Sequence, residues 1–372
     1  MVWVYFSVLC RCCLYLPIVR AMLGLILLLC LGFTLSAPLS LDVLTSHGLK
    51  VRNISFQSVN LNKPVRVVFI HAAVGVFTYT RKDRLGQQWG FGADILEEII
   101  DEVLKNRKLV ISLDWIYVGL LGAESDLEET KERLSLKYRT NVAQEDAYSS
   151  RQVAKRKIAR KKIRVVLEGT NKFMWEFPTL SLIQTYASKV HPESEILYLH
   201  TKGVRRNAPN DDTITQWRRY MLYWLVERHE ICQHVLARGA KTCGANKRGG
   251  GKACYGGNFW WAKAGYLAQK SPQVAEIDWS INRSDGARYG AEEWLLKGES
   301  PEAHTYKHYC VHHVHQDMRF CEIPRKWYAL EELGREYVYR KDGNCFNIGK
   351  LPANSTRNTS TWCHKDGFPE ID

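Results

Sequence analysis

The sequence predicts an α/β protein in which helices flank a mostly parallel sheet. Four continuous apolar runs are typical of strands that are covered on both faces, at residues 65–70, 109–118, 163–167 and 195–201. Helical patterns lie between or after them, at residues 93–106, 124–162, 178–189 and 214–238. Strands that alternate with helices favour a parallel sheet, and ligands of such sheets collect at the carboxyl ends of the strands.

The composition places the chain among ordinary globular proteins. Of its 372 residues 45% are apolar and 24% charged, which excludes collagen-like and disordered classes. The net charge is +13, but eight basic and no acidic residues fall between positions 151 and 164. The charge is therefore local, and we do not expect a nucleic-acid partner. This run is either a solvated helix face or a site for anionic lipid headgroups or an acidic donor.

The N-terminus predicts a membrane segment. Residues 21–41 carry no charge, and 21 residues at about 1.5 Å each span roughly 30 Å, enough to cross a bilayer core. Arg11 and Arg20 precede the segment and Asp42 follows it. The positive-inside rule then predicts a single-pass type II protein of the Golgi or ER membrane with a lumenal domain. A cleaved signal peptide, giving a secreted protein, and a cytosolic protein are the alternatives.

These features divide the chain into five parts. We expect a cytosolic segment at 1–20, a signal anchor at 21–41, a stem at 42–62, a catalytic domain at 63–340 and a loosely ordered tail at 341–372. Seven cysteines lie in the last 141 residues, with Cys243/Cys254 and Cys310/Cys321 as plausible local disulfides. Four N-glycosylation sequons also favour a glycoprotein of the secretory pathway: Asn53, Asn282, Asn354 and Asn358.

The first two elements have clear patterns. Residues 65–70 (VRVVFI) predict a buried strand. The segment 93–106 predicts an amphipathic helix because Ile95, Ile99 and Val103 recur at a spacing of four. Later, Pro178 at a first-turn position predicts the start of the helix 178–189.

The strand 195–201 ends in polar residues. Tyr198, His200 and Lys202 alternate onto one face, and Arg205 and Arg206 add charge just beyond the turn. Basic groups at the carboxyl end of a buried strand are suited to a phosphate-bearing ligand. The alternative is an ordinary strand exit with solvated basic residues.

Residues 254–262 (CYGGNFWWA) form a second motif. The two glycines allow a tight turn or a close backbone approach to a ligand. Asn258 offers both a donor and an acceptor, and Trp260 and Trp261 offer flat surfaces for sugars. Because the two tryptophans point to opposite faces, we expect one to be buried and one to line a site.

Two acidic residues, Glu292 and Glu293, open a short helix in the segment 289–295 (YGAEEWL). Such residues complement the helix dipole. A carboxylate in a cleft would instead serve as the general base for an acceptor hydroxyl.

Five of the twelve histidines lie within twelve residues, at positions 304, 308, 312, 313 and 315. His313 and His315 are weak candidates for a metal site, and surface or supporting roles are the alternative. A metal hydrolase built here is a minor alternative, because the sequence has neither HExxH nor GxSxG.

Several segments occur in an order that resembles uncharacterised glycosyltransferase-like proteins that use nucleotide sugars. They are ILYLHTKGV (196–204), WRRYM (217–221), GGNFWWAKAGYL (256–267) and YGAEEWL (289–295). The HTKG element and the upstream WEFPTL (175–180) are also similar to those of bacterial rhamnan synthesis protein F. The similarity covers about residues 64–330.

The resemblance implies a GT-A-like fold, a Rossmann-type sheet with the donor at the strand ends. Such enzymes usually carry Asp-x-Asp there to hold a divalent metal such as Mn²⁺. This chain has His200, Thr201 and Lys202 instead. Lys202 with Arg205 or Arg206 would neutralise the diphosphate without a metal, which we favour. The alternative keeps a metal on histidines.

The resemblance suggests a division of roles. The nucleoside would pack at residues 71–76, with Lys202 and His200 at the diphosphate. Asn258 and a tryptophan would orient the sugars, and Glu292 or Glu293 would deprotonate a glycan or glycoprotein acceptor. The rival hypothesis is a non-catalytic glycan-binding protein that kept the fold.

Overall fold

A computed structural model describes residues 44–45, 48–52, 62–75, 91–139, 161–171, 174–202, 212–248, 253–270, 274, 285–299, 307–312, 325 and 328–329. The chain divides into two compact units, residues 1–42 and 43–372, and all described residues belong to the second. The predicted anchor, 21–41, therefore lies outside the described part. Within that part, no helix combines the length and the apolar character needed to cross a membrane.

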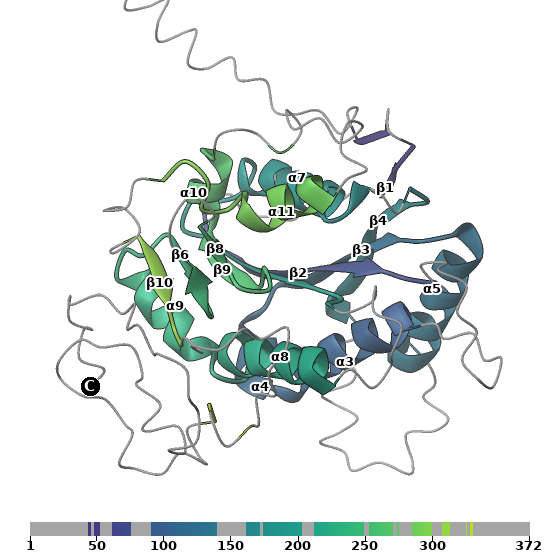
Figure 1. The fold of residues 1–372 in the computed structure, drawn as a ribbon, viewed down its shortest axis with the longest axis horizontal. Coiled ribbons are helices and arrows are strands. Elements are labelled where there is room, and N and C mark those ends of the chain that lie inside the picture. The colour runs from purple at the N-terminus through teal and green to yellow at the C-terminus, as the bar shows by residue number, and fades with distance from the viewer. Residues whose placement is uncertain are drawn as a thin grey trace, which may run out of the picture. The chain divides into compact units, whose positions relative to one another are not determined.

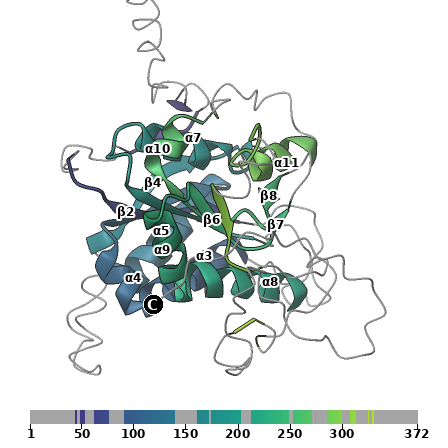
Figure 2. The same ribbon diagram turned by 90° about the vertical axis from the view of Figure 1, so that its left-hand side faces the viewer.

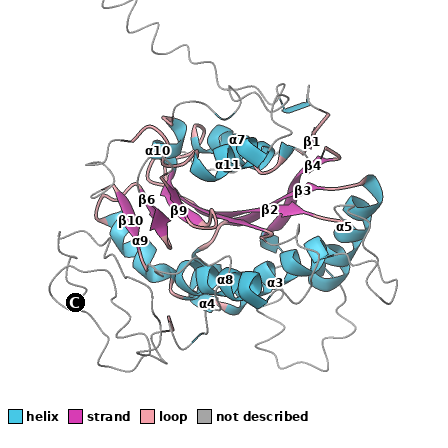
Figure 3. Cartoon of the chain, viewed as in Figure 1, coloured by secondary structure: helices cyan, strands magenta, loops and turns pink. Residues whose placement is uncertain are grey.

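The centre of the fold is an eight-stranded sheet in the order β1-β4-β3-β2-β5-β9-β6-β10 (Figure 3). Only β1 and β9 run antiparallel to their neighbours, which confirms the predicted mostly parallel sheet. The strands are β1 (Lys50–Val51), β2 (Arg66–Ala73), β3 (Trp115–Leu121), β4 (Ile163–Gly169), β5 (Glu195–His200), β6 (Thr242–Gly244), β9 (Trp260–Lys263) and β10 (His308–Cys310). A separate two-stranded ribbon pairs β7 (Lys247–Arg248) with β8 (Cys254–Tyr255).

Helices cover both faces of the sheet. The helical elements are α3 (Phe91–Lys105), α4 (Arg107–Ser112), α5 (Glu124–Arg139), α7 (Phe177–Ala187), α8 (Asp212–Leu222), the π-helical turn η4 (Tyr223–Glu227), α9 (His229–Ala237), α10 (Ala264–Ala268) and α11 (Asp285–Glu293). One layer contains α7, α10 and α11, and the other contains α3, α4 and α8 (Figures 1 and 2). This arrangement explains the continuous apolar strands. In β2, residues 67–70 have no solvent exposure because each face of the sheet packs against a helix layer.

The order of the strands fixes where a ligand would bind. From β2 the chain moves outward through β3 to β4, and then returns to β5 on the other side of β2. In open α/β sheets, ligands bind outside the carboxyl ends of the strands at the point where the order reverses. Here that point lies between the ends of β2 and β5, where His71 pairs with His200.

One predicted strand begins later than expected. Residues 107–112 form the short helix α4, and β3 starts only at Trp115, so the strand prediction for 109–118 was wrong over its first half. The side chain of Asn106 accepts a hydrogen bond from the Leu109 amide at 3.0 Å and so caps the helix. Leu109 and Val110 are buried, and a short apolar run does not by itself separate a strand from a buried helix.

The predicted single helix 214–238 is interrupted. The five residues of η4 form a π turn between α8 and α9. Side chains from elsewhere donate to carbonyls of this turn: Trp261 Nε1 to Leu225 at 2.9 Å and Asn106 Nδ2 to Val226 at 2.7 Å. These donors satisfy backbone acceptors that a regular helix would use internally.

Two further predictions need correction. Residues 42–62 were expected to form a stem, but β1 within them pairs with β4 and so belongs to the sheet. Cys243 bonds to Cys232 and not to Cys254. Cys321, the four sequons, the tail at 341–372 and residues 140–160 of the predicted helix 124–162 lie outside the described residues.

Candidate functional site

A cluster of buried polar groups lies at the carboxyl ends of β2 and β5. His71 belongs to β2, and β5 ends at His200, which Thr201 and Lys202 follow. All four side chains are buried. The Thr201 amide donates to the His71 carbonyl at 2.9 Å, and the Thr201 hydroxyl accepts from the Ala73 amide at 3.0 Å. These bonds fix the backbone that carries Lys202 at the edge of the sheet.

Glu176 is the centre of this cluster. Its Oε2 accepts hydrogen bonds from Tyr198 Oη at 2.9 Å and from Asn258 Nδ2, and its Oε1 lies 3.6 Å from His200 Nδ1. Burial, followed by the nearby Glu292 carboxylate, raises the pKa of Glu176. Glu176 thus joins the start of α7 to β5 and to the turn before β9.

Backbone strain accompanies this carboxylate. Trp175, next to Glu176, has a φ of 52°, and Asn258 has a φ of 57°, both in the left-handed region that non-glycine residues avoid. Strained residues of this kind cluster at functional sites, where surrounding contacts hold them in place. At Asn258 those contacts include the bonds to Glu176 and to Trp260.

One hydrogen bond places a hydrogen on a ring nitrogen of His200. Its Nε2 lies 2.7 Å from the Gly257 carbonyl oxygen. A carbonyl can only accept, so Nε2 carries a hydrogen, and Nδ1 lies on the side of Glu176. On the neighbouring strand, His71 Nδ1 contacts Thr179 Oγ1 at 2.9 Å, and burial lowers the pKa of His71 to about 4.

Lys202 has both polar and aromatic neighbours. Its Nζ lies 3.8 Å from Glu292 Oε1 and 4.2 Å from the centre of the Trp217 ring. Its backbone carbonyl accepts from Arg218 Nη1 at 3.0 Å, and Arg218 in turn pairs with Glu98 at 2.6 Å. The ammonium thus stands between a carboxylate from α11 and an aromatic face from α8.

The structure places both candidate bases at the end of α11, so the prediction that they open a helix was wrong. It also distinguishes the two residues. The Glu292 carboxylate reaches the cluster through Lys202. For Glu293, by contrast, the described contacts involve its backbone carbonyl, which accepts hydrogen bonds from the amides of Leu296 and Lys297. Glu292 is the candidate that the fold brings to the strand ends.

The two tryptophans differ from expectation. They do point to opposite faces of β9: Trp260 packs against Tyr198 at 5.0 Å, while Trp261 donates to a carbonyl of η4. Both are fully buried, however, so neither presents a face to a sugar. Asn258 is likewise buried, with Nδ2 on Glu176 and Oδ1 accepting from Trp260 at 3.0 Å. These three residues are therefore buried supports of the cluster and not surfaces that a ligand could contact.

The strand end does not fit a divalent metal. His200 Nε2 is engaged by a carbonyl, Thr201 Oγ1 accepts from a backbone amide, and Lys202 brings a positive charge. Metal ligands must offer lone pairs, which an ammonium lacks. Among the described residues, no three His, Cys, Asp or Glu side chains are grouped to hold a metal. Arg205, Arg206, His304, His313 and His315 lie outside them.

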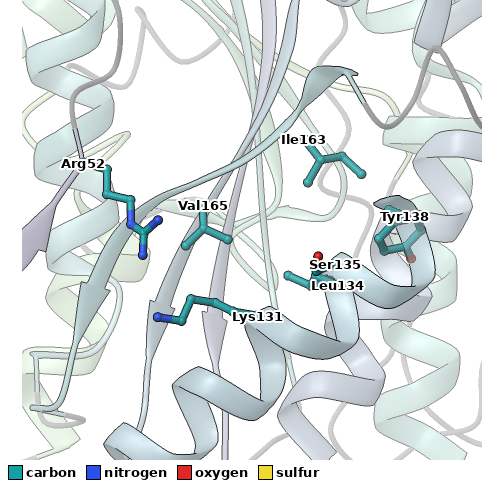
Figure 4. Close-up of a pocket in the computed structure, with 7 residues that line it drawn as sticks. All are labelled: Arg52, Lys131, Leu134, Ser135, Tyr138, Ile163 and Val165. Atoms are coloured by element: carbon teal, nitrogen blue, oxygen red, sulfur yellow. The ribbon is translucent and has the colours of Figure 1, made fainter. Parts of the chain in front are cut away.

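A pocket of about 120 Å³ lies elsewhere, between β4 and α5 (Figure 4). Its two cations, Arg52 and Lys131, both pair with the buried Glu168, at 2.7 and 2.9 Å. Ligand pockets usually enclose roughly 300–1,000 Å³, so this one is too small for a nucleotide sugar. It is lined by Arg52, Lys131, Leu134, Ser135, Tyr138, Ile163 and Val165.

Sequence reasoning missed several members of the cluster. Glu176 was not assigned a role, and neither was the Arg218–Glu98 pair that supports Lys202. His71 was expected only as part of the nucleoside segment 71–76, and Tyr198 only as a neighbour of His200 on one strand face. One signal was available: Glu176 is an acid within the largely apolar segment 174–180 (MWEFPTL). An acid among buried apolar residues needs partners, which marks it for attention.

Comparisons with known proteins add limited information. Residues 120–274, less than half of the chain, match the family model "Domain of unknown function (DUF8361)". No curated protein is similar enough in sequence to count as a match. A solved structure titled "Crystal structure of 4-diphosphocytidyl-2C-methyl-D-erythritol synthase" aligns at 12% identity over 65% of this chain and 95% of that one. Its TM-score of 0.27 is too low to support an argument.

Proposed function

We propose that this protein is a glycosyltransferase that moves a sugar from a nucleotide-sugar donor to a glycan or glycoprotein acceptor. The observation that supports it best is the Lys202–Glu292 pair, 3.8 Å apart and at the carboxyl ends of β2 and β5. A cation and a carboxylate at the switch point of a Rossmann-like sheet are suited to a ligand with a charged phosphate and a reactive hydroxyl. The proposal includes membrane anchoring through residues 21–41 in the ER or Golgi.

Each group has a chemical role in this proposal. Lys202 stabilises the negative charge that develops on the departing diphosphate. Glu292 accepts the proton of the acceptor hydroxyl as that oxygen attacks the anomeric carbon. Glu176 and His200 orient the turn at Gly257 and Asn258, and His71 stays neutral at physiological pH because its pKa is lowered to about 4. The transfer proposed here proceeds without a metal at the strand end, because Lys202 already supplies a positive charge there.

The proposal is tested by screening the purified full chain against a panel of UDP- and GDP-sugars, alone, with Mn²⁺ and with EDTA. We expect turnover of at least one donor, insensitive to EDTA. Lys202→Ala should lower that turnover by about 100-fold or more, because a charge-stabilising group is lost. Lys241→Ala removes an exposed lysine at the other end of the sheet and should act like wild type.

Three results would count against the proposal. Turnover that is unchanged in Lys202→Ala would remove the diphosphate role. Glycan binding without any nucleotide-sugar turnover would favour the non-catalytic hypothesis. Turnover that EDTA abolishes would show that a metal is required.

A further inference from the structure

The backbone of Lys202 is fixed by a hydrogen bond, whereas its ammonium group makes a longer contact with the Glu292 carboxylate. Arg218 fixes the Lys202 carbonyl at 3.0 Å, and Glu98 fixes Arg218 at 2.6 Å. The charged end of Lys202 faces Glu292 at 3.8 Å. That separation is about 1 Å longer than a tight charge-assisted hydrogen bond. The contact between the ammonium and Glu292 is thus longer than a direct hydrogen bond.

The two carboxylates near Lys202 are held very differently. Glu176 accepts from Tyr198 and Asn258 and faces His200. Moving it would break bonds to β5 and to the turn before β9. Glu292 lies near the end of α11, and its side chain is 14% exposed compared with 10% for Glu176 and 5% for Lys202. Of the two acids, Glu292 is the one that an incoming anion would displace.

A carboxylate and a phosphate compete for the same cation. Both present oxygens that accept from an ammonium, but a diphosphate carries more negative charge and more acceptor atoms. In a buried site the charge of Lys202 needs a counter-anion at all times. Glu292 supplies that anion when no donor is bound.

We propose that Glu292 occupies the phosphate position at Lys202 in the donor-free protein and that the donor diphosphate displaces it. This inference rests on the proposed function. The released carboxylate then faces the acceptor. An ion-paired carboxylate is a weaker base than one without a cation beside it. The acceptor hydroxyl is therefore activated only after the donor has bound, which makes donor binding the first step.

The test is calorimetric titration of the full chain with inorganic pyrophosphate and, separately, with UDP. Glu292→Gln keeps the shape of the side chain but removes the competing charge, so it should bind both probes about five- to tenfold more tightly than wild type. It should also lose sugar transfer, because the base is gone. Glu292→Asp withdraws the carboxylate from Lys202 and should also tighten binding. It provides a second variant if the first does not fold.

Two controls separate this inference from the proposed function. Glu102→Gln makes the same change in net charge on the exposed side of α3, and its binding should match wild type. Lys202→Met should lose binding of both probes. If Lys202→Met loses binding but Glu292→Gln and Glu292→Asp bind no more tightly than wild type, the exchange is wrong and the proposed function stands. If wild type binds neither probe, the proposed function fails, and the exchange fails with it.

Discussion

Two largely buried clusters in this protein contain the same kinds of residue in different surroundings. The site cluster comprises His71, Glu176, Tyr198, His200, Lys202 and Glu292. A second group, the Glu299 cluster, comprises Thr242, Tyr266, Lys270, Glu299 and His308. Each contains carboxylate, lysine and histidine side chains, and in each a tyrosine hydroxyl donates to a carboxylate: Tyr198 to Glu176 and Tyr266 to Glu299.

The Glu299 cluster connects secondary-structure elements. Glu299 lies 3.7 Å from both Lys270 Nζ and His308 Nε2, and His308 Nδ1 contacts Thr242 Oγ1 at 2.9 Å. Tyr266 and Lys270 also donate to the carbonyls of Leu295 and Lys297, in the segment that follows α11. These contacts hold that segment against α10, β6 and β10.

Position and backbone separate the two clusters. The Glu299 cluster lies at the starts of β6 and β10, whereas the site cluster lies at the carboxyl ends of β2 and β5. The turn before Glu299 uses Gly298 for its positive φ, whereas the site cluster places Trp175 and Asn258 in the same unfavourable region. Buried charge alone therefore does not mark a site. The place of the first cluster on the sheet and the strained residues beside it are the features that support the proposed function.

The largest expected difference is between substitutions of Lys270, which should affect stability, and of Lys202, which should affect turnover. Lys270→Met should lower the free energy of unfolding by about 3 kcal/mol, because it leaves the partly buried Glu299 without its cation. The folded protein should keep the nucleotide-sugar turnover that the proposed function predicts. Urea unfolding together with the turnover assay measures both. If Lys270→Met abolished turnover in folded protein, the division into a structural and a functional cluster would be wrong.

The buried Glu176 and the partly buried Glu299 should respond to pH in opposite directions. Burial raises the pKa of Glu176, so the folded state binds its proton more tightly than the unfolded state. Stability that depends on Glu176 is then lost as pH rises above about 4. Burial also acts to raise the pKa of Glu299, but Lys270 and His308 together hold it below its usual value. Stability that depends on Glu299 is lost as pH falls below about 4.

Denaturation of the wild type, Glu176→Gln and Glu299→Gln between about pH 3 and 7 tests this contrast. The stability gap between wild type and Glu176→Gln should shrink as pH rises. The stability gap between wild type and Glu299→Gln should widen as pH rises through the lower part of the range. Gaps that change with pH in the same direction would contradict the assignment.

The smallest effect concerns the tryptophans behind the site. Trp260→Phe removes the hydrogen bond to Asn258 Oδ1 and should lower the free energy of unfolding by about 1–2 kcal/mol. Because Trp260 is fully buried, glycan binding and donor affinity should change less than twofold. Thermal unfolding and titration measure the two effects. A large loss of sugar affinity with unchanged stability would restore the stacking role expected from the sequence.

Features that depend on local pattern could be predicted from the sequence. The apolar runs identified four strands, β2 to β5, although one run also included the helix α4, and the polar exit of β5 identified His200 and Lys202. Contacts between distant segments could not be predicted. Glu176 becomes central only because Tyr198 and Asn258, 22 and 82 residues further along the chain, fold against it. One of the two tryptophans was expected to line a site because their sequence does not show that both sides of β9 are covered.

The π turn η4 accommodates about one residue more than an α-helical turn, because its hydrogen bonds join residues five apart and not four. Deleting one residue within Tyr223–Glu227 should therefore let this turn close with regular α-helical hydrogen bonds. The carbonyls of Leu225 and Val226 would then accept within the helix, and the side chains of Trp261 and Asn106 would lose their acceptors.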